Sequence, residues 1–149
     1  MKFLSASCLL LLSAGAFAAD SPAPASPHGT GGKTVTPVDL GNIKVPKAVG
    51  TNARTVEELV TKRTELKDKP VLVRGKVVKF NPEIMGKNWV HLRDGSGSAA
   101  DGSNDILVTT MATAKVGDVV TVEGTVRTDK DFGAGYSYRV LIEDATFKP

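Results

Sequence analysis

The spacing of hydrophobic residues changes near Pro70, and the two sides of that point predict different elements. In residues 53–70, apolar side chains recur at helical spacing on one face, at Val56, Leu59, Val60 and Leu66. Thr55 and Glu58, three positions apart, form a capping box, which is typical of the start of a helix. Pro70 closes the segment. Residues 53–70 therefore predict one α-helix.

After Pro70 the pattern becomes that of β-strands. Five short segments are rich in β-branched and aromatic residues and are separated by Gly, Asp, Asn and Ser, namely 71–80, 88–94, 105–110, 118–129 and 136–147. Gly75 and Gly124 each lie inside a valine-rich segment, where a bulge would bend the strand. The pattern predicts an all-β small barrel, a five-stranded OB-fold, preceded by one α-helix.

The N-terminal residues have a different character. Residues 1–19 contain a lysine, an apolar run and then small residues, which is the order of a secretory signal peptide. Residues 20–37 are rich in Pro, Gly and Ser and predict a disordered spacer. The helix and OB-fold are expected over residues 38–149. We expect a periplasmic or secreted monomer with no membrane association after signal cleavage.

Composition narrows the class of function. The chain has 149 residues, with 19 Lys and Arg against 16 Asp and Glu. The only cysteine, Cys8, and Lys2 lie in the signal segment, so the exported form would have no thiol and a net charge of +2. That charge is too small to require a polyanionic partner. With no nucleophile motif around any serine, the sequence predicts a non-enzymatic binding protein.

The second predicted strand contains the only tryptophan of the chain beside a histidine. Val90 and Leu92 alternate as a core-facing pair. Trp89, His91 and Arg93 are therefore expected on the opposite, outer face. The tryptophan is predicted to lie outside the core.

The same alternation places Met111, which follows the third predicted strand, on the outer face. If the second and third strands pair as a hairpin, Met111 falls beside Met85 and Trp89, near His91. Thioether sulfur and imidazole nitrogen are ligands suited to Cu(I), and an indole face can shield a bound cation. The hypothesis is that Met85, His91 and Met111 bind Cu(I). The alternative is that the same side chains only fill apolar gaps.

Four motifs resemble a known family, namely VRGKVV, IMGKNWVHLRDGSG, VGDVVTVEGTV and DKDFGAGYSY. They look like the small exported OB-fold proteins of the NrfJ-like kind, which are usually described as nucleotide- or DNA-binding. Some of those proteins are encoded beside periplasmic multihaem reductases, so the resemblance implies an OB-fold and a periplasmic redox enzyme as partner. In fold and ligand types, the chain also resembles the periplasmic OB-fold chaperone of copper and silver efflux systems, which implies a metal acceptor.

The family resemblance leaves two further functions open. For nucleic-acid binding, Trp89 would be a stacking platform on the usual OB-fold face. Arg74, Lys76, Arg93 and Arg139 would contact phosphates. Tyr136 and Tyr138 would lie at the edge of the binding face. Gly133 and Gly135 are expected to be turn residues with positive φ. The other function is that of an accessory factor that binds only protein.

Overall fold

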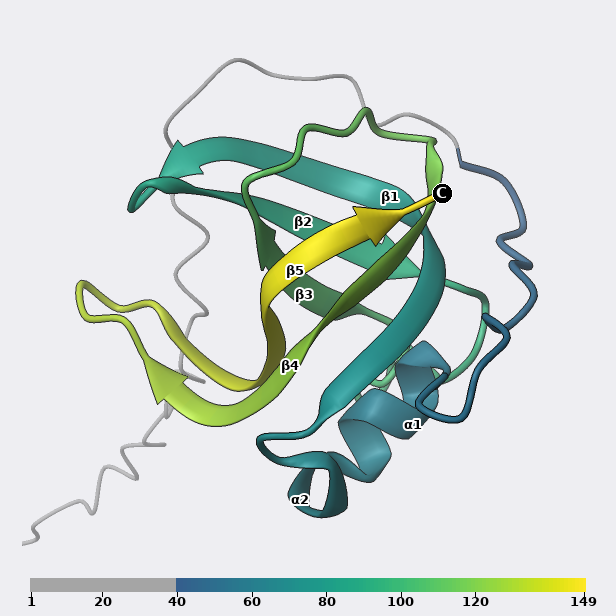
Figure 1. Ribbon diagram of the computed structural model, residues 1–149, viewed down its shortest axis with the longest axis horizontal. Coiled ribbons are helices and arrows are strands. Elements are labelled where there is room, and N and C mark those ends of the chain that lie inside the picture. The colour runs from purple at the N-terminus through teal and green to yellow at the C-terminus, as the bar shows by residue number, and fades with distance from the viewer. Residues whose placement is uncertain (1–39) are drawn as a thin grey trace, which may run out of the picture. The chain divides into compact units, whose positions relative to one another are not determined.

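The computed structural model describes residues 40–149, so the predicted signal peptide (1–19) and spacer (20–37) lie outside the described residues. The elements are α1 (Val56–Thr61), α2 (Arg63–Leu66), β1 (Pro70–Ile84), β2 (Lys87–Arg93), β3 (Ile106–Thr110), β4 (Val119–Asp131) and β5 (Ser137–Lys148) (Figure 1). All five predicted strands are confirmed. Neither helix in this part of the chain has the length and apolar character needed to cross a bilayer.

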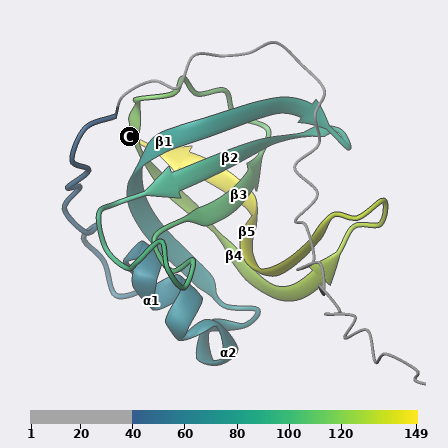
Figure 2. The ribbon, with the colours of Figure 1, turned by 180° about the vertical axis from the view of Figure 1, so that it is seen from behind.

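The five strands form a closed ring in the order β1-β2-β3-β5-β4, with β4 returning to β1. The β3–β5 pair is parallel and the other four pairs are antiparallel. β1 closes the ring because it is long: its first half pairs with β4 and its second half pairs with β2. Both views show the β1–β2 and β4–β5 hairpins projecting to the same side of the ring (Figures 1 and 2).

The predicted single helix is wrong, because the chain forms two short helices with a break at Lys62. The capping box of Thr55 and Glu58 is confirmed. At the end of α1, the Thr61 hydroxyl donates a hydrogen bond of 2.8 Å to the Glu57 carbonyl oxygen. Such back-bonding by threonine bends helices, and it precedes the break.

The loop after β2 holds the first turn of α1 against the ring. The Asp94 carboxylate accepts a hydrogen bond from the Val56 amide at 2.9 Å, and the Ser96 hydroxyl oxygen accepts one from the Glu57 amide at 3.0 Å. Two of the amides that a helix leaves unpaired at its start are thereby satisfied from another element. This arrangement fixes the loop that leads from β2 to β3.

The inner face of the ring is the main core, as the alternation predicts. Its buried side chains include Val71, Val73, Val77, Val90, Leu92, Ile106, Val108, Val122, Val126 and Ile142, and the helices add Val56, Leu59 and Leu66. A second, smaller apolar cluster lies apart from this core and contains Trp89, Leu107 and Leu141. The molecule therefore buries apolar side chains on both faces of β2 and β3.

Gly124 is in a bulge, as predicted. The register of β4 against β5 shifts between Glu123 and Thr125. A Cβ atom at Gly124 would lie 2.5 Å from Cγ2 of Ile142, closer than carbon atoms approach in proteins. Only glycine lets the two strands come this close.

The prediction of a bulge at Gly75 is wrong. The β1–β4 register passes through Gly75 without a shift, and the β1–β2 register shifts between Val77 and Lys79 instead. A Cβ at Gly75 would meet the Leu92 Cβ at 3.2 Å. The role of this glycine is thus close packing between β1 and β2.

Candidate functional site on the outer face

Four rings form an aromatic cluster outside the main core, and we use that name for Trp89, Phe132, Tyr136 and Tyr138. Trp89 extends from β2, and the other three come from the β4–β5 hairpin. The Trp89 ring centroid lies 5.1 Å from that of Phe132 in a T-shaped arrangement, 5.5 Å from that of Tyr138 and 5.9 Å from that of Tyr136. These distances are typical of favourable aromatic pairs.

Trp89 is on the outer face, as predicted, but the prediction that it lies outside any core is wrong. It is only 3% exposed, and its indole nitrogen donates a hydrogen bond of 2.8 Å to the Ile84 carbonyl oxygen. Rings from the β4–β5 hairpin cover it. Trp89 therefore cannot stack on a base, and an exposed ring of the aromatic cluster would have to do so instead.

Tyr136 is the ring of the aromatic cluster that solvent reaches most freely, with 36% of the residue exposed. It follows the hairpin turn, where Gly133 and Gly135 have φ of 80° and 84°, so their predicted positive φ is confirmed. Tyr138 lies deeper, and burial, together with neighbouring Tyr136, raises the pKa of its hydroxyl. A ligand would first touch Tyr136.

Basic side chains lie beside the aromatic cluster, and we call Arg74, Lys76, Lys79, His91 and Arg93 the basic face. The strand register brings them together, because Lys76 pairs with Arg93 and Lys79 pairs with His91 across β1 and β2. Directly opposite residues on one face have Cβ atoms about 5 Å apart. Arg74 is two residues from Lys76 on the same side of β1 and is exposed.

The other predicted basic residue, Arg139, is on β5 and is exposed. Its side chain forms no ion pair within residues 40–149, and the same holds for Arg74 and Lys79. On the basic face, Arg74 and Lys79 are thus available to an anion. Lys76 instead donates to the Leu40 carbonyl oxygen at 3.4 Å.

Asp105 organises the basic face and was missed by the sequence analysis. One carboxylate oxygen lies 2.7 Å from His91 Nδ1, and the other accepts from Arg93 Nε at 2.9 Å. Burial raises the pKa of this carboxyl, but the hydrogen bonds and charges of His91 and Arg93 lower it more, so that it falls below its ordinary value. The only sequence signal is an acidic residue at the first position of a predicted strand, next to a polar loop.

Replacing Asp105 by asparagine is expected to lower the free energy of unfolding by about 2 kcal/mol at pH 7, through loss of two charge-assisted hydrogen bonds. Because the folded pKa is depressed, the contribution is complete above the ordinary carboxyl pKa of 3.8 and is lost as pH falls through the lower folded value. Urea unfolding at pH 7 and pH 3 measures this. An equal difference between wild type and variant at both pH values would contradict it.

The strand register separates two of the three predicted Cu(I) ligands, His91 and Met111. Met85 is in the β1–β2 turn and is 49% exposed, and Met111 follows β3 and is 77% exposed. His91 pairs with Leu107, four residues before Met111. Four residues of strand span about 13 Å, so the register does not bring His91 to Met111. Cu(I) binding stays a prediction, which anaerobic titration with Cu(I) can test.

Within residues 40–149, no group of three His, Cys, Asp or Glu side chains is placed to hold a metal ion.

No protein-family model, curated protein or solved structure matches the chain. The resemblances to the NrfJ-like proteins and to the copper chaperone therefore stay predictions. The aromatic cluster and the basic face are the features of the molecule that indicate a function.

Proposed function

We propose that this protein is a non-enzymatic OB-fold module that binds single-stranded nucleic acid on its outer face. Two features support the OB-fold. The five strands form a closed ring, and β3 and β5 are a parallel pair within it. In OB-folds, the face of strands 2 and 3 and the loops between strands 1 and 2 and between strands 4 and 5 bind oligonucleotides. The aromatic cluster, which combines a ring of β2 with rings of the β4–β5 hairpin, supports an assignment to that place.

The observation that carries the proposal is that the basic face adjoins the aromatic cluster along one strand. Trp89, His91 and Arg93 alternate on the outer side of β2. Proteins that bind single strands combine cations that follow the phosphates with rings on which bases stack. Neither an apolar protein partner nor a single metal ion requires that combination.

The charge of the basic face favours a polyanionic ligand more strongly than the net charge of the whole chain does. The basic face has four Lys and Arg side chains and a histidine, and Asp105 is the carboxylate that forms ion pairs with it. The overall charge of +3 hides this asymmetry. Electrostatic attraction depends on the local field, so a nearly neutral protein can bind an anion at one face.

The proposal extends to location and partners. We infer export to the periplasm or outside the cell from the signal-peptide pattern of residues 1–19. A periplasmic redox enzyme remains the candidate protein partner that the NrfJ-like resemblance implies. Nucleic acid bound in that compartment would be extracellular or released material.

Replacing Tyr136 by alanine is expected to weaken binding of a fluorescent oligonucleotide of about 12 nucleotides by roughly 5- to 150-fold, the effect of losing one stacked base. Fluorescence anisotropy at low salt measures the affinity. Tyr136→Phe is the matched control, because it retains the ring and should bind within about twofold of wild type. No binding by the wild-type protein at low salt would contradict the proposed function.

A further inference from the structure

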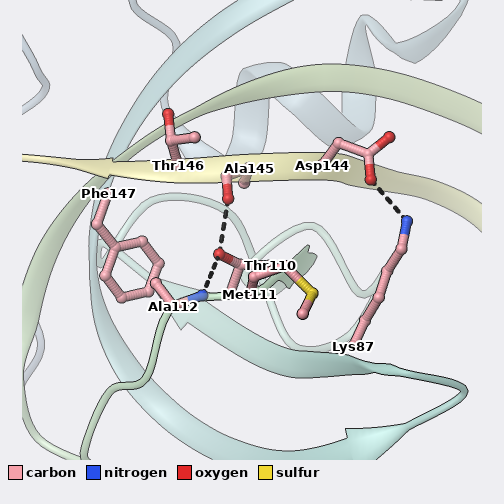
Figure 3. A pocket seen from close by; sticks show the side chains of 8 residues that line it. All are labelled: Lys87, Thr110, Met111, Ala112, Asp144, Ala145, Thr146 and Phe147. Carbon is pink, nitrogen blue, oxygen red and sulfur yellow. Dashed lines mark hydrogen bonds and ion pairs between the residues drawn. The ribbon is translucent and has the colours of Figure 1, made fainter.

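A cavity of about 320 Å³ opens where β3 ends beside β5 (Figure 3). Its walls include the Met111 side chain and the Phe147 ring, and the ion pair of Lys87 and Asp144 lies at one side. Ligand sites in proteins are mostly apolar cavities of roughly 300 Å³ or more with a few polar groups. This cavity is large enough for one ring system.

The cavity exists because β3 and β5 separate. The parallel register shifts between Val108 and Thr110, and Asp144 opposite this shift has a left-handed φ of 52°. The Thr110 hydroxyl donates a hydrogen bond of 2.6 Å to the Ala145 carbonyl oxygen, at the last paired position of β3 and β5. Beyond it, β5 continues to Lys148 beside β4 alone.

Lys87 links the cavity to the strand that carries the proposed nucleic-acid face. This residue is on β2, two positions before Trp89 and on the same side of the strand. Two strand residues span about 7 Å, roughly the reach of one nucleotide from the aromatic cluster. A strand that stacks on the aromatic cluster could therefore place a nearby base in the cavity.

Lys87 and Asp144 give the cavity a preference for ligands that carry a phosphate and a hydrogen-bond donor. The Lys87 ammonium lies 2.6 Å from one Asp144 carboxylate oxygen, and this hydrogen bond lowers the pKa of Asp144, so the group is an ionised acceptor at neutral pH. The pair is exposed on the Asp144 side and contributes little by itself. Lys87 can thus turn to a phosphate while Asp144 accepts a hydrogen bond from a ligand.

We propose that this cavity accepts one base of the bound strand and selects bases with an exocyclic amino group. The flat ring would lie between Met111 and Phe147, and Asp144 would accept a hydrogen bond from the amino group, as carboxylates do from cytosine N4. Thymine has no exocyclic amino group, and its one ring donor, N3–H, lies between two carbonyl oxygens that a carboxylate repels. This inference rests on the proposed function and adds base selectivity to it.

The test compares labelled oligo-dC and oligo-dT of equal length by fluorescence anisotropy, with the full-length chain and its Asp144→Asn variant. Asparagine tolerates the left-handed backbone of this position, so the variant should fold. Wild type is expected to bind oligo-dC about tenfold more tightly than oligo-dT, and the variant to lose that ratio. Circular dichroism confirms folding of the variant.

The possible failures are distinguishable. Equal binding of the two oligonucleotides by wild type, or an unchanged ratio in Asp144→Asn, would overturn the base-selective cavity and leave the proposed function standing. Binding of neither oligonucleotide would overturn both. A ratio that falls in Asp144→Asn but not in Lys115→Gln, a charge change on the exposed β3–β4 loop, supports the cavity.

Discussion

Replacement of Trp89 by alanine is expected to lower the free energy of unfolding by about 3–5 kcal/mol, the usual cost of removing a buried large aromatic side chain. The indole is almost fully buried, contacts three other rings and donates a hydrogen bond to Ile84. Its loss would uncover Leu107 and Leu141 and remove the surface on which the β4–β5 hairpin packs. The hairpin should then become the least stable part of the fold.

Urea unfolding followed by circular dichroism measures the effect, since the variant has no tryptophan fluorescence. Trp89→Phe is the matched control: it keeps a ring against Phe132 and Tyr138 and should lose less than half as much stability. A loss of under about 1 kcal/mol in Trp89→Ala would contradict the burial of the indole, because solvent-exposed substitutions usually change stability by no more than about 0.5 kcal/mol.

The second large effect concerns binding. Replacing Lys76 and Arg93 together by glutamine is expected to weaken oligonucleotide binding about 100-fold at low salt, because two adjacent cations of the basic face are lost. Arg93 gives only its Nε to Asp105, so its other guanidinium nitrogens remain for a phosphate. The Lys76 ammonium likewise has donors beyond the one given to Leu40. The two residues are cross-strand neighbours on β1 and β2. The matched control is Lys67→Gln with Lys69→Gln, which removes the same charge from exposed positions after α2.

That control should change affinity by no more than about threefold, since distant charges are screened within about 10 Å at moderate salt. Equal weakening by both double variants would mean that binding responds only to net charge. It would then give no reason to prefer the basic face over any other surface.

Alternation of side chains predicted the ring and its faces correctly, but it could not predict what covers each face. Val90 and Leu92 identify the inner side of β2, and Trp89 is on the other side as expected. Its burial comes from a hairpin more than 40 residues later in the chain. Periodicity is local, whereas this cover depends on where the β4–β5 hairpin turns, which no local pattern fixes.

The separation of His91 from Met111 has a similar origin. The sequence offered a β2–β3 hairpin only as a condition, and the register of that hairpin depends on how its long loop is folded. Buried Asp94 and Ser103 anchor the loop, and Leu92 then pairs with Ile106. This pairing decides which outer residues are neighbours, and it places His91 opposite Leu107.

Only some residues of the basic face could be predicted from the sequence. Arg74, Lys76 and Arg93 were expected to contact phosphate, yet Lys79 and Asp105 were not singled out. Lys79 joins the face because the register shift after Val77 returns it to the outer side. Asp105 joins from a loop. Both depend on irregularities that an ideal two-residue period does not describe.

The salt dependence of oligonucleotide binding tests the central proposal most directly. Three or four phosphate contacts on the basic face predict that the logarithm of affinity falls against the logarithm of salt concentration with a slope of about −2 to −3 for wild type. For the Lys76 and Arg93 double variant, the slope should be shallower by about 1.4, while the Lys67 and Lys69 control should keep the wild-type slope. Absence of binding, or one common slope for all three proteins, would contradict a nucleic-acid site on this face.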